Sequence, residues 1–158
     1  MIGRRILVLS VALLLAVTLG AAAQPLGVGG AFSIDSLGGL PSSAMLSLKV
    51  PQVPVVWGIG LQVNQNDFNM AFTADWWLYQ EHLVGFLNLY AGPGIYLSLP
   101  NRVEAGGRVP IGLNAYPLDF LELFIEIAPT LVLFSDTGID IPSFGLQGAF
   151  GFRFWFDT

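Results

Sequence analysis

The segment from Leu121 to Phe134 alternates between apolar and polar positions almost without exception. Leucine and isoleucine fill most odd positions, whereas Glu122, Glu126 and Thr130 stand on even ones. A period of two predicts a β-strand, because successive side chains of a strand point to opposite faces. The two faces of this strand therefore meet different surroundings.

The same alternation recurs often enough to build a whole sheet. With the window 120–135, the segments are Leu26–Asp35, Ala44–Val50, Val55–Asn64, Phe68–Tyr79, 85–99, Arg108–Pro117 and Leu146–Phe156. Most are near the 9–11 residues that a tilted strand needs to cross a bilayer. Eight strands are also the smallest usual number for an outer-membrane barrel. Pro93, Pro110 and Pro129 fall inside these strands and predict bulges or kinks, because proline donates no ladder hydrogen bond.

The first residues form a separate unit. Arg4 and Arg5 precede an apolar run from Ile6 to Leu19, and small residues follow up to Ala23. This order is typical of a secretory signal peptide. We therefore expect a signal peptide at residues 1–23 and a single barrel domain at residues 24–158.

The composition narrows the classes of function. Beyond the signal segment, four basic residues stand against 11 acidic ones, a net charge of −7, and nucleic acid binding needs the opposite balance. There is no cysteine, which excludes disulfides, thiolate metal sites and cysteine catalysis. A mean hydropathy of +0.67 with 11% charged residues is too apolar for an ordinary soluble domain.

The polar face of the strands decides which side is the interior. In a soluble lipid-carrying barrel the apolar face lines a cavity, and the outer face is rich in charge. Here the second face holds mainly Gly, Ala, Asn, Ser and Tyr, which suits the narrow interior of an eight-stranded barrel. We therefore predict an all-β, eight-stranded antiparallel transmembrane up-and-down barrel, with the soluble carrier as the alternative.

Four charged residues are predicted to face the lumen: Arg108, Glu122, Glu126 and Arg153. Folding the last two strands about a loop near Thr137–Pro142 places Glu126 opposite Arg153, and Arg108 has the same inward parity. An arginine between two carboxylates can bond both. We interpret this group as a structural plug of the lumen.

No catalytic residue, metal site or cofactor is predicted. The single histidine, His82, is expected in the turn between the fourth and fifth strands. Glu122 and Glu126 lie about 13 Å apart along one strand, too far for shared acid–base work. Glu104, Asp136 and Asp140 are expected as solvated acids in short outward loops.

The residues resemble known barrels at two levels. The whole mature chain is similar to the small OmpA/OmpX-type barrels, and the row Phe150, Phe152, Phe154 and Phe156 looks like the C-terminal signature read by the outer-membrane assembly machinery. Asp157 and Thr158 depart from it, because they follow the last aromatic. The runs 108–113 and 121–129 look like a largely uncharacterised spirochaetal small-barrel family, whose members are linked to surface interaction or envelope structure.

These inferences together predict a non-enzymatic protein of the bacterial outer membrane with a structural or surface-interaction role. The expected partners are the lipid bilayer, the outer-membrane assembly machinery and a host surface protein, with no nucleic acid. The alternative function is a carrier or narrow conduit for a small apolar molecule or lipid, entering laterally at Pro93 or Pro129.

Overall fold

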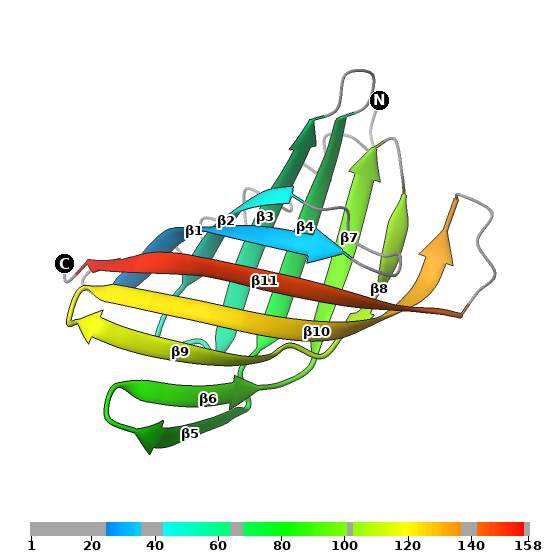
Figure 1. Cartoon of the computed structure of the whole chain (residues 1–158). Helices are drawn as coiled ribbons and strands as arrows, with labels where there is room; N and C mark the ends of the chain where they lie inside the picture. The colour runs from blue at the N-terminus through cyan, green and yellow to red at the C-terminus, as the bar shows by residue number, and fades with distance from the viewer. Residues whose placement is uncertain (1–24, 36–42, 64–67, 101–102, 137–141, 157–158) are drawn as a thin grey trace.

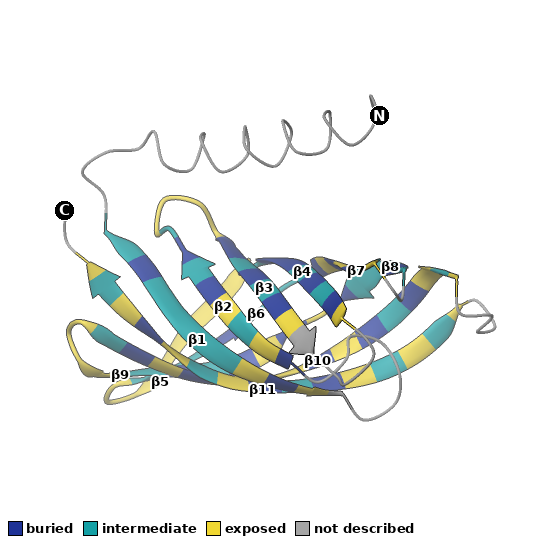
Figure 2. Ribbon diagram, turned by 90° about the horizontal axis from the view of Figure 1, so that it is seen from above, coloured by how far each residue is buried: buried dark blue, intermediate teal, exposed yellow. Residues whose placement is uncertain are grey.

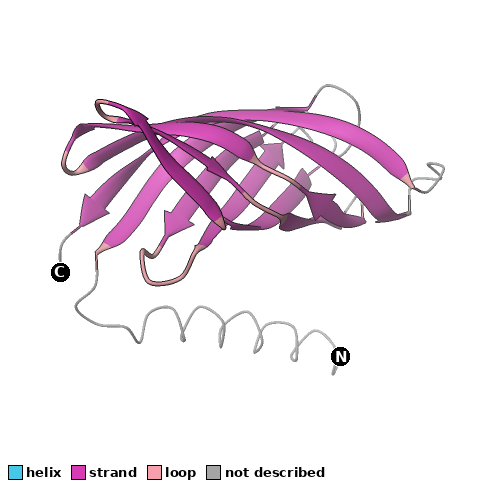
Figure 3. Cartoon of the chain, turned by 90° about the horizontal axis from the view of Figure 1, so that it is seen from below, coloured by secondary structure: helices cyan, strands magenta, loops and turns pink. Residues whose placement is uncertain are grey.

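The computed structural model describes residues 25–35, 43–63, 68–100, 103–136 and 142–156, so the predicted signal peptide lies outside the described residues. The described chain consists of antiparallel strands and turns (Figures 1 and 3). The strands are β1 Leu26–Asp35, β2 Ser43–Lys49, β3 Val55–Val63, β4 Phe68–Trp76, β5 Tyr79–Val84, β6 Leu87–Ala91, β7 Gly94–Pro100, β8 Glu104–Arg108, β9 Ile111–Leu118, β10 Leu121–Ser135 and β11 Ser143–Phe156. Over these ranges there is no helix of the length and hydropathy that crossing a bilayer requires.

Eight strands close into a ring, in the order β11, β1, β2, β3, β4, β7, β8 and β10, with β10 pairing back onto β11. Two residues separate β4 from β5, β6 from β7, and β8 from β9. Each of these pairs is one long strand with an interruption. The predicted all-β, eight-stranded antiparallel barrel is therefore confirmed.

The barrel is strongly staggered. Paired residues can be followed around the ring from Leu121 through Phe154, Val28, Leu48, Trp57, Ala74, Ile95 and Gly107 to Leu131. One circuit thus returns to β10 ten residues further along (131 − 121 = 10). With about 3.3 Å per residue and about 4.8 Å between strands, this stagger tilts the strands by about 40°, as closed barrels require.

The interior prolines fall along one line across the wall. Pro93 and Pro110 interrupt the long strands as predicted, at the β6–β7 and β8–β9 breaks. Pro129 lies inside the continuous β10, where the partner of β10 changes from β9 to β8. The three proline carbonyls accept hydrogen bonds from the Trp76, Gly92 and Val109 amides, so the wall stays hydrogen-bonded across the line.

The two faces are assigned by burial (Figure 2). Along β10 the even residues Glu122, Phe124 and Thr130 are buried, while Leu123, Ile125 and Ile127 are about half exposed. The row Phe150 to Phe156 on β11 is likewise exposed at its phenylalanines. The polar, glycine-rich face is therefore the lumen, and the apolar face is the exterior.

Two expected loop positions were wrong. His82 lies within β5 opposite Asn88, and the turn comes later, at Gly85–Phe86, where Gly85 has a φ of 59° that favours glycine. Glu104, expected in a solvated loop, begins β8 and is fully buried. Both strands extend further than their sequence pattern suggested, because pairing with a neighbouring strand holds polar residues in extended backbone.

One strand edge in the described wall lacks a neighbour. β5 pairs with β6 but with no other described strand. The last contact on its other side joins the Trp77 amide to the Pro54 carbonyl, at 2.7 Å, in the turn between β2 and β3. Past this point the ring is open at the end of the barrel that carries the turns at 50–54, 85–86 and 119–120; we call this opening the mouth.

Candidate functional site

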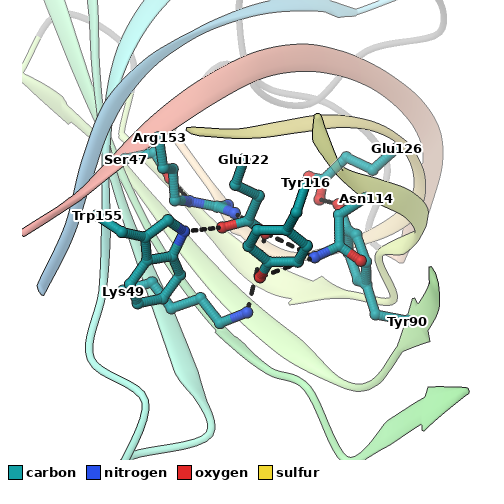
Figure 4. A network of polar contacts seen from close by, with 9 residues as sticks. All are labelled: Ser47, Lys49, Tyr90, Asn114, Tyr116, Glu122, Glu126, Arg153 and Trp155. Atoms are coloured by element: carbon teal, nitrogen blue, oxygen red, sulfur yellow. Dashed lines mark hydrogen bonds and ion pairs between the residues drawn. The ribbon is translucent and has the colours of Figure 1, made fainter. Parts of the chain in front are cut away.

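The lumen holds a chain of charged side chains, which we call the lumen network (Figure 4 shows part of it). Its members are Lys49, Asp75, Glu104, Arg108, Glu122, Glu126 and Arg153, and Glu126 is the least buried of them. These include every lysine and arginine of the described ranges. Charges removed from water must be paired or hydrogen-bonded, so the contacts of the network decide what it does.

The part of the network nearer the mouth is centred on the Glu122 carboxylate. Arg153 Nη1 lies 2.9 Å from Glu122 Oε1, and the same oxygen accepts a hydrogen bond from Asn114 Nδ2 at 2.8 Å. Trp155 Nε1 donates to the other oxygen at 3.1 Å. Lys49 Nζ lies 3.9 Å from Oε1, beyond hydrogen-bond distance. Two cations therefore share one carboxylate here.

The deeper part of the network is centred on Arg108. Its Nη2 donates to Glu126 Oε1 at 2.7 Å, and its Nε lies 3.2 Å from Asp75 Oδ1. Here one cation lies between two carboxylates. This is the arrangement that the sequence suggested for arginine, with Asp75 as a member that was not expected.

Tyr90 joins the two parts. Its hydroxyl donates to Glu126 Oε2 at 2.8 Å, and its ring stacks on Trp77 with centroids 3.7 Å apart. Two cations also lie near the Trp77 ring: Lys49 Nζ is 3.5 Å from its centroid and Arg153 Cζ is 5.3 Å away. Cation–π attraction of this kind is strongest where water is excluded.

Glycines in the lumen let side chains reach across a strand. Arg153, Gly29 and Ser47 are successive cross-strand neighbours, and Arg153 Nε donates to Ser47 Oγ at 2.8 Å over the glycine.

The same arrangement occurs twice more, in the rows Asp75–Gly94–Arg108 and Tyr90–Gly112–Glu126. A Cβ at Gly94 would collide with the Asp75 carboxylate, and one at Gly112 with the Tyr90 ring and hydroxyl. The abundance of glycine on the inner face thus makes room for the network.

The predicted partner of Arg153 was wrong. Arg153 lies opposite Glu122, and Glu126 lies opposite Ala149, so Arg153 pairs with Glu122 and Arg108 with Glu126. The observed register differs from the expected one by four residues. A shift of even length keeps every side chain on its face, which is why the inward residues were identified correctly while their pairing was not.

Sequence reasoning also missed three members of the network. Lys49 and Asp75 have inward parity in their strands, and this parity was a usable signal. Glu104 gave no such signal, because it precedes two glycines in a segment without clear alternation. Its Oε1 accepts a hydrogen bond from Ser135 Oγ at 3.3 Å.

A cavity of about 400 Å³ opens at the mouth. Its walls include Lys49, Trp77, Tyr116 and Trp155 together with the turn prolines Pro51 and Pro54. A neighbouring cavity of about 240 Å³ is more polar and is lined in part by Lys49, Gln80, His82 and Asn114. Lys49 is a member of the lumen network and also lines both cavities.

The other chemistry-bearing residues are dispersed. His82 Nδ1 is hydrogen-bonded to Asn88 Oδ1 at 3.0 Å on the exposed β5–β6 hairpin. Ser33 and Ser43 bond to each other, and Ser47 accepts from Arg153. Within the described ranges no three His, Asp or Glu side chains are grouped to hold a metal ion.

Comparison with known proteins gives one informative likeness. No protein-family model and no curated protein matches the chain. The crystal structure of Neisserial surface protein A (NspA) is similar in fold, with a TM-score of 0.52 over 85% of this chain and 98% of that one. The sequences are 12% identical, so the likeness shows the eight-stranded barrel fold alone.

Substituting Gly112→Ala should destabilise the barrel by about 1–3 kcal/mol, because the new methyl group collides with the Tyr90 side chain that bonds Glu126 and with the Ile125 carbonyl. Gly107→Ala, the control on the preceding segment of the same long strand, has nothing closer than 3.9 Å to its new Cβ and should be neutral or slightly stabilising. Urea unfolding in detergent micelles measures both. Equal loss of stability in the two variants would contradict the inference that Gly112 makes room for the contact between Tyr90 and Glu126.

A double-mutant cycle tests the pairing of Arg153. Combining Arg153→Met with Glu122→Gln should show a coupling of about 1–3 kcal/mol, the range for residues in direct contact. The matched cycle with Glu126→Gln should show less than about 0.5 kcal/mol. A larger coupling with Glu126 would restore the pairing expected from the sequence.

Proposed function

We propose that the chain is an integral protein of the bacterial outer membrane, with a lumen closed by side chains and a structural or surface-interaction role. The observation that carries this proposal is the distribution of charge on the exterior. Among described residues the exposed charged side chains are Glu81, within the β5–β6 hairpin at the mouth, Asp119, in the turn between β9 and β10, and Asp136, directly after β10. The wall between these positions is an apolar belt.

The belt is large and continuous enough to need a hydrocarbon partner. Exposed apolar side chains occur on ring strands all around the barrel, for example Phe32 on β1, Leu46 on β2, Leu61 on β3, Ile95 on β7 and Leu133 on β10. A soluble monomer rarely exposes apolar patches of this extent. A closed ring also meets the requirement that backbone groups in hydrocarbon be paired within the protein.

The lumen network supports a closed barrel. Arg153 and Glu122 are almost completely buried, and the contacts of Arg153 join β11 to β10 and, over β1, to β2 on the inner face of the wall. Eight strands enclose a space that side chains fill. We therefore assign Arg108, Glu122, Glu126 and Arg153 a structural role as a plug.

A non-enzymatic role agrees with how the candidate groups are engaged. The carboxylates Glu122 and Glu126 form ion pairs with arginines, and the His82 imidazole is hydrogen-bonded to an amide. We propose that function resides in recognition, with host or envelope proteins contacting the loops at the end opposite the mouth. Those loops lie largely outside the described residues.

The alternative, a carrier for a small apolar molecule or lipid, is favoured by the cavity at the mouth. The expected lateral entrance at Pro93 or Pro129 is disfavoured, because both carbonyls accept hydrogen bonds from the adjoining strand. The unpaired edge of β5 offers an entrance instead.

Arginine substitutions test the membrane placement. Ile127 on β10 and Leu118 at the end of β9 are similarly exposed, at 55% and 50%. At mid-membrane an outward arginine costs about 2–4 kcal/mol, falling to about 0–1 kcal/mol near the interface. Ile127→Arg should therefore destabilise the barrel in lipid vesicles far more than Leu118→Arg. Near-neutral effects of both, as on a water-facing surface, would refute the placement.

Electrical recording tests the plug. The chain inserted in a planar bilayer should carry no steady ion current, because the lumen network and its neighbours fill the channel. Insertion is verified separately by flotation with lipid vesicles, and a pore-forming peptide serves as the positive control. A persistent conductance that scales with inserted protein would show that the lumen is open.

A further inference from the structure

The mouth of the barrel combines a buried cation, aromatic walls and a lateral opening. We propose that the 400 Å³ cavity binds the anionic headgroup of a single-chain amphiphile such as a fatty acid, with Lys49 as the partner of the carboxylate. This inference uses the proposed membrane placement only for the route by which the amphiphile arrives.

The charge at the mouth favours an anion. Lys49 and Arg153 share the Glu122 carboxylate. Arg153 Nη1 lies 2.9 Å from Glu122 Oε1, whereas Lys49 Nζ lies 3.9 Å from the same oxygen. Lys49 is 9% exposed and lines both cavities. Asp119 also lines the larger cavity and Glu81 the smaller one, but both are exposed, so water screens their charges more strongly. A carboxylate entering the cavity would give Lys49 a hydrogen-bonded partner.

The walls favour a ligand with an apolar part. Trp77, Tyr116 and Trp155 line the cavity with prolines 51 and 54. The faces of the Trp77 ring are in contact with Tyr90 and Lys49. Trp77 therefore presents the edge of its ring to the cavity and holds the Lys49 ammonium in place. The site thus combines aromatic and proline walls with a few polar side chains, Lys49, Gln80 and Asp119 among them, which suits a ligand with one charged end and an apolar part.

The opening beside β5 gives the chain of the amphiphile a path to the exterior. Hydrogen bonding between the β2–β3 turn and the following wall ends at Trp77. Beyond it Leu78 and Val84 are 69% and 71% exposed. An unpaired strand edge is not stable in hydrocarbon, so this edge belongs at the level of the lipid headgroups. An amphiphile at that level has its charged end beside Lys49 and its chain along the apolar exterior.

Fluorescence quenching can test this site directly. The assay uses the full chain with Trp57→Phe and Trp76→Phe, so that Trp77 and Trp155 report, reconstituted in phosphatidylcholine nanodiscs. The probe is dodecanoate brominated near its carboxylate. We expect saturable quenching, with at least tenfold weaker binding in Lys49→Met, because a hydrogen bond to a charged group is lost. Lys49→Arg should retain binding.

Two controls separate charge from partitioning and from folding. Brominated dodecanol, which lacks the anion, should quench without saturation and equally in all variants. Asp119→Asn removes an exposed rim charge without touching the lumen network, and it should tighten dodecanoate binding severalfold. That variant keeps the proposal testable even if Lys49→Met does not fold.

Three outcomes would overturn the proposal. They are saturable binding of dodecanol equal to that of dodecanoate, unchanged affinity in both Lys49→Met and Asp119→Asn, and displacement of the probe by inorganic phosphate at similar concentration. The last would assign the cavity to small free anions. If the protein binds dodecanoate but Ile127→Arg and Leu118→Arg both have near-neutral effects on stability, the membrane placement is refuted and the anion site is retained.

Discussion

Closure of the strands into a narrow ring is the constraint on which the rest of this structure depends. With β10 paired to β11, every ring strand has a neighbour on both sides, and the enclosed space is only wide enough for side chains. Charged groups in that space have little water available, so they must satisfy one another. Part of this demand is met by contacts of the lumen network that reach over Gly29, Gly94 and Gly112.

Charge is unequally balanced along the lumen network. Around Arg108 two carboxylates share one guanidinium, and around Glu122 two cations share one carboxylate. Tyr90 connects the two groups through its hydroxyl and its stacked ring. Within the network, excess positive charge is thereby placed on the side of the mouth, beside a cavity, and excess negative charge deeper inside. This separation makes Lys49 available for a role beyond the structural one.

The open edge of β5 is the exception to closure, and it coincides with the cavity. Around the described ring neighbouring strands are paired, and hydrogen bonds to the carbonyls of Pro93, Pro110 and Pro129 hold the wall together where the strands are interrupted. At the mouth the turn at 50–54 is short, and β5 extends past it without a second partner. In the described residues, this departure from the barrel pattern lies beside the cavity in which we propose that a ligand binds.

The sequence by itself determined the number of strands in the ring and the face that most of their residues occupy. These properties follow from alternation with a period of two, which is local. The register between strands was decided only by the tertiary structure, because it depends on the ten-residue stagger that closes the ring. For this reason Arg153 pairs with Glu122 rather than Glu126, although all three were correctly placed in the lumen. The burial of Glu104, the strand around His82 and the cavity at Lys49 likewise arise from contacts between segments distant in the chain, which no local pattern encodes.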